Sequence, residues 1–296
     1  MPVPVPAPLA VAVPEDGSAR LAFSRAPPEG LRAAGVAGAD EVGNGSVSLV
    51  VGVDPAYPNA PLAARSRLTA KVGLRADQAV YAAQPHGCGV AVVGRADRGR
   101  GALDHADAVP GVDALVTTEV GVGLVVLAAD CVPLLLVDPG RAVAAAHAGR
   151  RGLVAGIVPA TLEVLARETA SLGGGDCSRV VGVIGPAIGG CCYELPEGIA
   201  DEVAAAHPEA RGTTTWGTPS VDVAAGVVAQ LRAAGIARIQ RVGTCTVCDG
   251  YRWFSARASA STTLRRSAST GRHAGIVCRI GLPVPNQRFA SARHSP

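Results

Sequence analysis

Short apolar runs follow one another along the chain, and turn signals such as Asp138-Pro139-Gly140 separate them. Runs of this length, bounded by glycine, proline or aspartate, are typical of β-strands. We therefore predict strands at residues 89–93, 114–118, 124–129, 132–137, 142–146, 180–184, 239–242 and 275–279.

Two helices are expected among these strands. After His147 the apolar residues recur at helical spacing as far as Leu165, and Pro159 should kink or interrupt that helix. Asp222 can cap a second helix that ends near Gly235. Because strands outnumber helices and do not alternate with them regularly, we expect an α+β fold in which mixed β-sheets are flanked by helices.

The chain has 296 residues, 48% of them hydrophobic, which is enough for a sizeable core. We expect a single folded domain over residues 19–282. Residues 1–18 are rich in proline and residues 283–296 in Pro, Ser, Ala and Arg, so both segments are predicted to be flexible. The glycine-rich segment 173–175 is interpreted as a loop.

Composition argues against two classes of partner. The formal net charge is only +3, and three Phe, four Tyr and two Trp leave few rings for base stacking, so nucleic-acid binding is not expected. Asp130, Cys131, Pro133 and Asp138 interrupt the most hydrophobic region, so no membrane span is expected. The N-terminus lacks the positive start of a secretory signal, which favours a cytoplasmic location and reduced thiols for the eight cysteines.

Cys131 and His147 each lie where a predicted strand meets a loop, and His86 lies in a turn-like QPHG segment. Thiolate and imidazole are natural zinc ligands, and three protein ligands with an open fourth position form the catalytic arrangement. The separations of 45 and 16 residues match no compact metal motif. A buried thiol with hydrogen-bonded histidines therefore stays open, as does a pair in which Cys131 is the nucleophile and His147 the base.

Several arginines are candidates for anion binding. Arg150, Arg151 and Gly152 open the helix predicted after His147, where free N–H groups and the helix dipole favour phosphate. Arg151 is the favoured phosphate ligand, with Gly149 beside it, and Arg150 is expected at the surface. Arg257 in WFSAR and Arg272 in TGRHAG lie near apolar strands and could contact substrate. Surface or salt-bridge roles remain the alternative for each of these arginines.

Two further segments contain paired cysteines. Cys245 and Cys248 form a CTVC motif that could be redox-active or half of a metal site. In GPAIGGCCYEL, two glycines stand beside Cys191 and Cys192, which indicates a close approach of the backbone.

Taken together, the blocks QPHG, LAADCVPLLLVDP, AAAHAGRRGLVAGIV, GPAIGGCCYEL, WFSAR and TGRHAGIV resemble the bacterial YfiH-like proteins. That family is labelled multicopper polyphenol oxidoreductase or laccase-domain and is regarded as a family of purine nucleoside phosphorylases. The resemblance covers about residues 80–280. It implies a single α+β domain that binds one zinc through His86, Cys131 and His147.

The resemblance also implies the reactions. They are cleavage of adenosine, inosine, guanosine or methylthioadenosine with phosphate, and deamination of adenosine. Zinc would hold and activate a water or orient the substrate, Arg151 and the helix start would hold phosphate, and Asp130 or Glu194 could handle protons. Cys131, His147 and Asp130 are thus the predicted catalytic residues. The expected partners are purine nucleosides and phosphate, with the chain a monomer or a weak homo-oligomer.

Two departures from the family pattern keep other functions open. Arg150 stands where the family usually has the tryptophan of HAGWRG, and Ser48-Leu49-Val50 only partly matches a Ser-Leu-Asn block. The older family label implies another alternative, a copper-dependent polyphenol oxidase, although six histidines are few for a multicopper centre. The other is a non-catalytic zinc- or redox-responsive binding protein.

Overall fold

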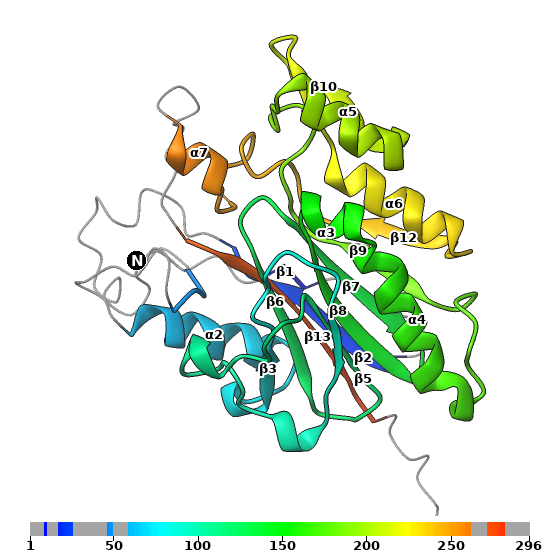
Figure 1. Ribbon diagram of the computed structural model, residues 1–296. Helices are drawn as coiled ribbons and strands as arrows, with labels where there is room; N and C mark the ends of the chain where they lie inside the picture. Colours follow the sequence, from blue (N-terminus) through cyan, green and yellow to red (C-terminus); the bar gives the residue numbers. More distant parts are fainter. Residues whose placement is uncertain are drawn as a thin grey trace, which may run out of the picture.

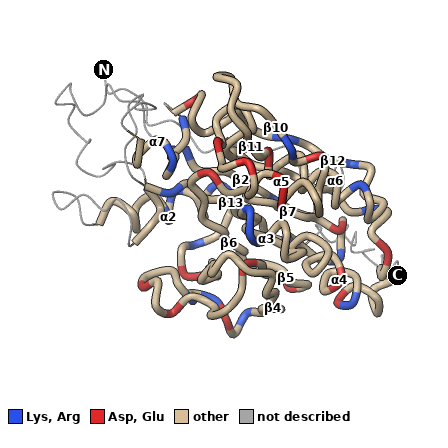
Figure 2. The backbone as a smooth tube through the Cα atoms, turned by 45° about the horizontal axis from the view of Figure 1, so that its top comes forward, with Lys and Arg blue, Asp and Glu red and all other residues tan. Residues whose placement is uncertain are grey.

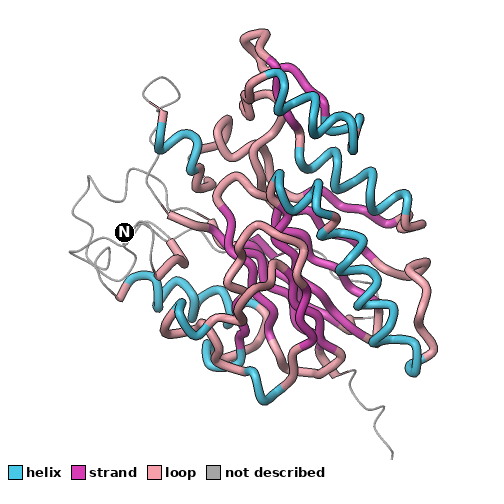
Figure 3. Tube along the Cα trace, viewed as in Figure 1, coloured by secondary structure: helices cyan, strands magenta, loops and turns pink. Residues whose placement is uncertain are grey.

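Two β-sheets packed face to face form the centre of the molecule, and helices cover both outer sides (Figures 1 and 3). The computed structural model describes residues 9–10, 17–25, 46–49, 59–250, 252–261 and 271–281. Basic and acidic residues are interspersed along the backbone (Figure 2). In the described part of the chain, no helix is both long enough and apolar enough to cross a membrane.

The first sheet has five strands and the second has six, and each mixes parallel with antiparallel pairs. The order of the first sheet is β1 (Leu9–Ala10), β2 (Ala19–Phe23), β13 (His273–Arg279), β6 (Gly123–Ala128) and β3 (Ala79–Tyr81). The order of the second is β12 (Arg238–Arg241), β9 (Val181–Ile184), β7 (Val132–Asp138), β8 (Ala142–Ala148), β5 (Ala114–Thr117) and β4 (Val90–Val92). A separate hairpin joins β10 (Arg211–Thr213) and β11 (Pro219–Val221).

Helices lie on the outer faces of the two sheets. Helix α2 (Ala60–Lys71) packs on the first sheet, and α3 (Arg150–Ala155), α4 (Ile157–Thr169) and α6 (Val223–Ala233) pack on the second. Helix α5 (Glu197–Ala206) lies by the β10–β11 hairpin, and α7 (Ala256–Ala260) is a single short helix. Short 3-10 turns occur at Ala76–Gln78, Arg95–Asp97, His105–Asp107, Ala170–Leu172 and Pro208–Ala210.

Strand β7 shows why the central strands are mostly apolar. Leu134 and Leu136 pack with the helices on the outer face, whereas Leu135 and Val137 pack between the sheets. Since successive side chains of a strand point to opposite faces, a strand buried on both faces is apolar along most of its length. The alternation therefore fixes one face of β7 toward α4 and the other toward the first sheet.

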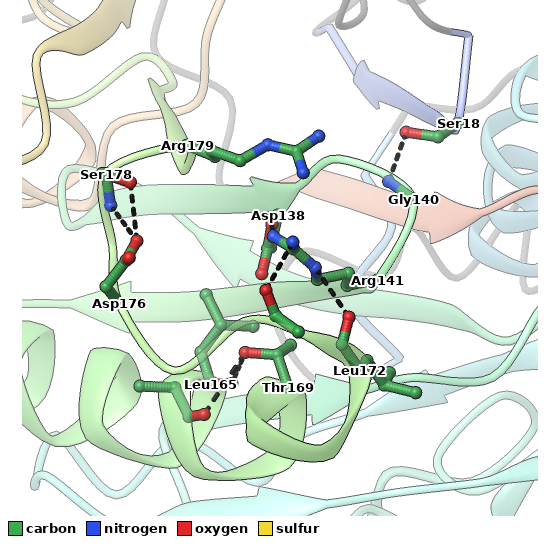
Figure 4. Close-up of polar contacts among 12 residues, drawn as sticks. Ser18, Asp138, Gly140, Arg141, Leu165, Thr169, Leu172, Asp176, Ser178 and Arg179 are labelled. Atoms are coloured by element: carbon green, nitrogen blue, oxygen red, sulfur yellow. Dashed lines mark hydrogen bonds and ion pairs between the residues drawn. The ribbon is translucent and has the colours of Figure 1, made fainter.

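The turn between β7 and β8 is tied to the rest of the fold by polar contacts (Figure 4). The Arg141 guanidinium pairs with the buried Asp138 carboxylate at 3.2 Å and donates to the carbonyl oxygen of Leu172. The backbone N–H of Gly140 donates to the hydroxyl of Ser18, which precedes β2. These bonds close the end of the sandwich away from Cys131, which lies before the other end of β7.

The predicted α+β fold with mixed sheets is confirmed, and all eight predicted strands are present with ends within two residues. Asp222 caps α6 as predicted, since its carboxylate accepts from the N–H of Ala225. The prediction for Pro159 was wrong: the break lies at Gly156, whose φ of 85° ends α3 and starts α4. Pro159 is tolerated because the first turn of α4 needs no N–H from it.

Some strands were not predicted, among them β2 and β3. Both are short, and their alternation is too brief to separate a strand from a loop. The segments predicted to be flexible, 1–18 and 283–296, lie mostly outside the described residues. Within the first of them, Leu9–Ala10 pairs with β2 and Ser18 is buried.

Candidate metal centre

Strand pairing brings the predicted ligands together. Cys131 directly precedes β7, and the antiparallel register of β7 with β8 places Pro133 opposite His147. The start of β7 thus lies beside the end of β8. Cys131 and His147 are therefore close in space, although 16 residues separate them in sequence. His86 reaches the same place from the loop between β3 and β4.

The donor atoms of His86, Cys131 and His147 all lie within 4.8 Å of one another. The rings of His86 and His147 meet edge to face, with centroids 4.7 Å apart. His147 is buried, Cys131 is half-buried and His86 is exposed, so the group is open on one side. Two imidazoles and one thiol with an open side form the donor set of a catalytic zinc site, and these residues fit such an ion.

Asp113, which directly precedes β5, organises this group. Its Oδ1 accepts from the Nδ1 of His147 at 2.9 Å and from the backbone N–H of His86 at 3.0 Å. Its Oδ2 accepts from the backbone N–H of Gly87 at 2.7 Å. With Nδ1 bound to a carboxylate, His147 presents Nε2 as the free ligand atom, which is the usual second-shell arrangement of metal-binding histidines.

Sequence reasoning did not assign Asp113 a role. Its signal would have been a charged residue immediately before a fully apolar strand that pairs with the histidine's strand. Burial acts to raise the pKa of Asp113, but the bonds from His147, Gly87 and His86 outweigh it and lower the pKa. The carboxylate is therefore the stable form inside the fold.

The thiol and the buried imidazole shift each other's protonation. Burial acts to raise the pKa of Cys131, but hydrogen bonds from His147 and His86 lower it to about 6. Burial acts to lower the pKa of His147, but Asp113 and Cys131 raise it to about 9. A thiolate at neutral pH is the form that binds metal ions.

Gly149 lets the backbone pass close to the three ligands. A Cβ atom built there would lie 3.0 Å from the Sγ of Cys131 and 3.1 Å from the Cδ2 of His86, closer than most Cβ contacts in proteins. Its φ of −84° and ψ of 174° are open to any residue, so space and not backbone strain requires glycine here. Gly149 was predicted to bind phosphate, and the structure shows it against the ligands themselves.

The ligands lie at the wall of a cavity of about 550 Å³. This volume is within the range of small-molecule sites. Part of the lining is apolar, from Leu127, Ala128, Ala129, Ile188 and Val223. Polar groups come from Ser48 and Gln84, among others.

Backbone strain gathers at the same cavity. In the described part of the chain, the only residues other than glycine with positive φ are Gln84, His86 and Asp130, and all three line the cavity. Such conformations cost free energy and cluster where function holds them in place. The Gln84 side chain compensates by pairing with the backbone of Leu127, donating to its oxygen at 2.7 Å and accepting from its N–H at 2.8 Å.

Asp130 lines the cavity, but its carboxylate is engaged on both oxygens. Oδ1 accepts from the Thr246 hydroxyl at 2.5 Å, and Oδ2 accepts from the backbone N–H of Arg257 at 2.7 Å. Glu194, the other candidate proton carrier, accepts from the indole of Trp216 at 3.0 Å and does not line the cavity. This geometry gives Asp130 a positioning role at the start of α7.

The arginines differ from prediction in one respect. Arg150, Arg257 and Arg272 line the cavity, whereas Arg151 is exposed, donates to the carbonyl oxygen of Pro85 at 3.3 Å and lies outside the lining. The sequence favoured Arg151 over its neighbour as the anion ligand. Adjacent helical residues point about 100° apart, and the start of α3 turns Arg150 inward.

Tyr193 completes the wall beside these arginines. The guanidinium of Arg257 lies over the Tyr193 ring, 5.0 Å from its centroid, and donates to the carbonyl oxygen of Glu194 at 2.8 Å. Burial and the nearby Cys131 raise the pKa of the Tyr193 phenol, while Arg150 and Arg257 act in the opposite direction. An aromatic ring with a guanidinium over it thus lines the cavity that contains the ligands.

Known proteins are similar to this chain in both sequence and fold. Residues 51–280 match the family model described as multi-copper polyphenol oxidoreductase laccase. A purine nucleoside phosphorylase of Streptomyces coelicolor is 44% identical over 222 residues, which cover 74% of this chain and 83% of that protein. An adenosine deaminase from an unknown prokaryotic organism is 35% identical over 204 residues, covering 66% and 76%.

Among solved structures, YlmD from Geobacillus stearothermophilus superposes with a TM-score of 0.74 at 30% identity, covering 93% of this chain and 97% of that one. The matched residues include the strands and loops that supply His86, Cys131 and His147. The chain therefore belongs to the family described as multi-copper polyphenol oxidoreductase laccase, whose relatives include proteins named purine nucleoside phosphorylase and adenosine deaminase.

Proposed function

We propose that this protein is a zinc-dependent purine nucleoside phosphorylase that also deaminates adenosine. The observation that carries the proposal is the open group of His86, Cys131 and His147 at the wall of a cavity that also contains three arginines. The names of the relatives supply the reaction class, since a phosphorylase and a deaminase both act on purine nucleosides. The substrates are adenosine, inosine, guanosine or methylthioadenosine, with phosphate.

The cavity has the parts that such substrates require. Its apolar wall suits a purine ring, and Ser48 and Gln84 offer polar groups to a ribose. Guanidinium groups bind phosphate oxygens through paired N–H donors, and Arg150, Arg257 and Arg272 bring three of them to one space. We assign phosphate binding to these three and not to Arg151.

Side chains around the candidate metal centre would hold its ligands and the phosphate-binding groups in position. A bound zinc ion lowers the pKa of a water molecule and polarises an oxygen or nitrogen of the substrate. Asp113 holds His147 in the tautomer that leaves Nε2 free. Asp130 fixes the backbone of Arg257, so that the guanidinium stays over the Tyr193 ring and beside the cavity.

Zinc accounts for this donor set better than a multicopper centre. The chain has six histidines, and in the described residues one group of potential ligands contains histidine, with two of them. A centre of several copper ions needs more imidazoles than this. Three ligands around one open position are instead the catalytic zinc arrangement.

The reaction is tested by incubating the zinc-loaded protein with adenosine, with and without phosphate, and separating the products by chromatography. Adenine that forms only with phosphate indicates phosphorolysis, and inosine indicates deamination. Cys131→Ala should abolish both activities and the zinc held by His86, Cys131 and His147. Full activity in a zinc-free Cys131→Ala protein would overturn the proposal.

Two further outcomes separate the alternatives. Stoichiometric zinc with no turnover of any of the four nucleosides would favour a binding protein. Copper content together with oxygen uptake on a diphenol would favour the oxidase. We expect the reaction in the cytoplasm, where the cysteines, all free in the structure, stay reduced.

A further inference from the structure

Four cysteines that the proposed reaction does not use gather beside the cavity. Cys191 and Cys192 are adjacent in the loop after β9, and Cys245 and Cys248 lie in the loop after β12. Their four sulfur atoms all lie within 4.8 Å of one another. The CTVC motif alone was only half of a metal site, and the fold supplies the other half from a segment more than fifty residues away.

The backbone brings these two loops into register. Ala187 and Cys245 form a parallel β-bridge, and the N–H of Thr246 donates to the carbonyl oxygen of Ala187 at 3.1 Å. The N–H of Gly189 donates to the Sγ of Cys245 at 3.3 Å. Backbone N–H groups that point at a cysteine sulfur favour its thiolate form, which is the form that ligates metals.

The sulfur positions suit one tetrahedral ion. Zinc bound to four thiolates at about 2.3 Å places the sulfurs about 3.8 Å apart. In the structure the Sγ of Cys248 lies 3.7 Å from that of Cys191 and 3.5 Å from that of Cys192. These separations are close to the tetrahedral edge and well beyond the 2.05 Å of a disulfide bond.

Apart from these backbone bonds, the two loops share a small apolar core. Among the described residues, its buried members are Ile188, Cys192, Val247 and Ala258, with Cys191, Tyr193 and Cys245 packed against them. A core this small contributes little burial free energy, and small units of this kind are commonly held by a metal. A cross-link between the loops would supply the missing constraint.

We infer that Cys191, Cys192, Cys245 and Cys248 bind a second zinc ion with a structural role, separate from the His86, Cys131 and His147 centre. On binding, the four thiols release their protons and four Zn–S bonds form, so no oxidant or reductant takes part. All four ligand positions are filled by protein, which is the closed arrangement of structural zinc sites.

This ion would brace one wall of the cavity. Thr246, inside the CTVC turn, donates its hydroxyl to Asp130, and Asp130 in turn holds the backbone of Arg257. Tyr193 directly follows the Cys191–Cys192 pair and carries the ring beneath Arg257. Fixing the four sulfurs therefore fixes both partners of the Tyr193–Arg257 contact.

The first test is the zinc content of the purified full-length protein, measured by inductively coupled plasma mass spectrometry. We expect two zinc ions per chain in the wild type. The double variant Cys245→Ser/Cys248→Ser should hold one, and Cys131→Ser should also hold one. Cys177→Ser, which replaces a half-buried cysteine outside both groups, should keep two. One zinc in the wild type, unaffected by the double variant, would overturn the inference.

The second test identifies the ligands while all four cysteines of the site are intact. X-ray absorption at the zinc edge should show about four sulfur neighbours at about 2.3 Å in Cys131→Ser, and an average of about 2.5 sulfurs per zinc in the wild type. An average of about one sulfur in the wild type would exclude the second ion. Alkylation followed by mass spectrometry should find all four thiols reduced and reactive only after chelation, and disulfide bonds among them would also refute the inference. Neither test depends on nucleoside turnover, so failure of the proposed function leaves both readouts intact.

Discussion

Replacing Asp113 by asparagine tests whether this buried carboxylate prepares the metal centre. The side chain accepts three hydrogen bonds, from the Nδ1 of His147 and the backbone N–H groups of His86 and Gly87. An asparagine of the same shape has only one acceptor oxygen. Whichever way its amide is turned, its NH₂ group must face at least one of these donors at 2.7–3.0 Å.

The size of the effect follows from this mismatch. If the NH₂ group faces the ring, His147 must carry its proton on Nε2, the atom assigned to the metal. If it faces Gly87, a buried N–H loses its acceptor, which costs about 1–3 kcal/mol. Changes to groups that orient metal ligands commonly weaken metal affinity 10- to 100-fold. We expect Asp113→Asn to weaken zinc binding by about that factor, or about 1.4–2.7 kcal/mol.

The assay is competition with a chromophoric zinc chelator at pH 7.5, on protein whose folding has been checked by circular dichroism. Asp138→Asn is the matched control. Asp138 is as buried as Asp113, but it lies at the end of β7 far from Cys131. It should lose stability with its Arg141 pair but keep wild-type zinc affinity at the histidine-containing centre. Equal affinities for Asp113→Asn and the wild type would refute the role given to Asp113.

Three further results are expected. Gly149→Ala should weaken zinc binding by about tenfold or more in the same competition assay, because the new Cβ would lie 3.0 Å from the Sγ of Cys131. Unchanged zinc affinity would show that Cys131 and His86 can shift to make room for the methyl group. Arg272→Ala should raise the KM for phosphate by about tenfold or more in initial-rate assays, whereas Arg151→Ala should leave this KM unchanged. A raised KM in Arg151→Ala and an unchanged one in Arg272→Ala would instead support the prediction from sequence. Burial lowers the pKa of His273 to about 4, below its value of about 6.5 in the unfolded chain, so the unfolded state binds the extra proton and stability falls as pH drops through this window. Urea unfolding of the metal-free protein should show a loss of about 2 kcal/mol between pH 6.5 and pH 5 that is smaller in His273→Gln, and equal losses would contradict this origin.

The strands could be predicted from sequence because their signal is local. An apolar run with a turn at each end indicates a strand without information from the rest of the chain. The ends of β7 and β8 were predicted within two residues. Their pairing is not local. The register that sets Pro133 opposite His147 depends on both faces being buried between other layers, and no window along the chain contains those layers.

The same distinction explains the candidate site. Resemblance to a family pointed to His86, Cys131 and His147, but Asp113 needed the β5–β8 pairing to bring it to His147. The helix was predicted to open at Arg150, as it does. The choice between Arg150 and Arg151 depended instead on which side of α3 faces the cavity, since one step along a helix turns a side chain by about 100°, and the sequence does not contain the cavity wall.

Asp130 is a predicted catalytic residue for which the structure suggests a further role. A carboxylate beside Cys131 suggests proton transfer, and a free carboxylate in that cavity could do it. In the structure its backbone has a φ of 90° and both oxygens accept hydrogen bonds, from Thr246 and from the N–H of Arg257. One of these donors belongs to the CTVC turn and the other to the helix that carries the cavity guanidinium. A residue with a strained backbone and hydrogen bonds to both carboxylate oxygens is suited to holding its partners, Thr246 and Arg257, in place. Through Thr246, Asp130 thus connects the CTVC turn to Cys131, the next residue in the chain and the sulfur ligand of the candidate metal centre.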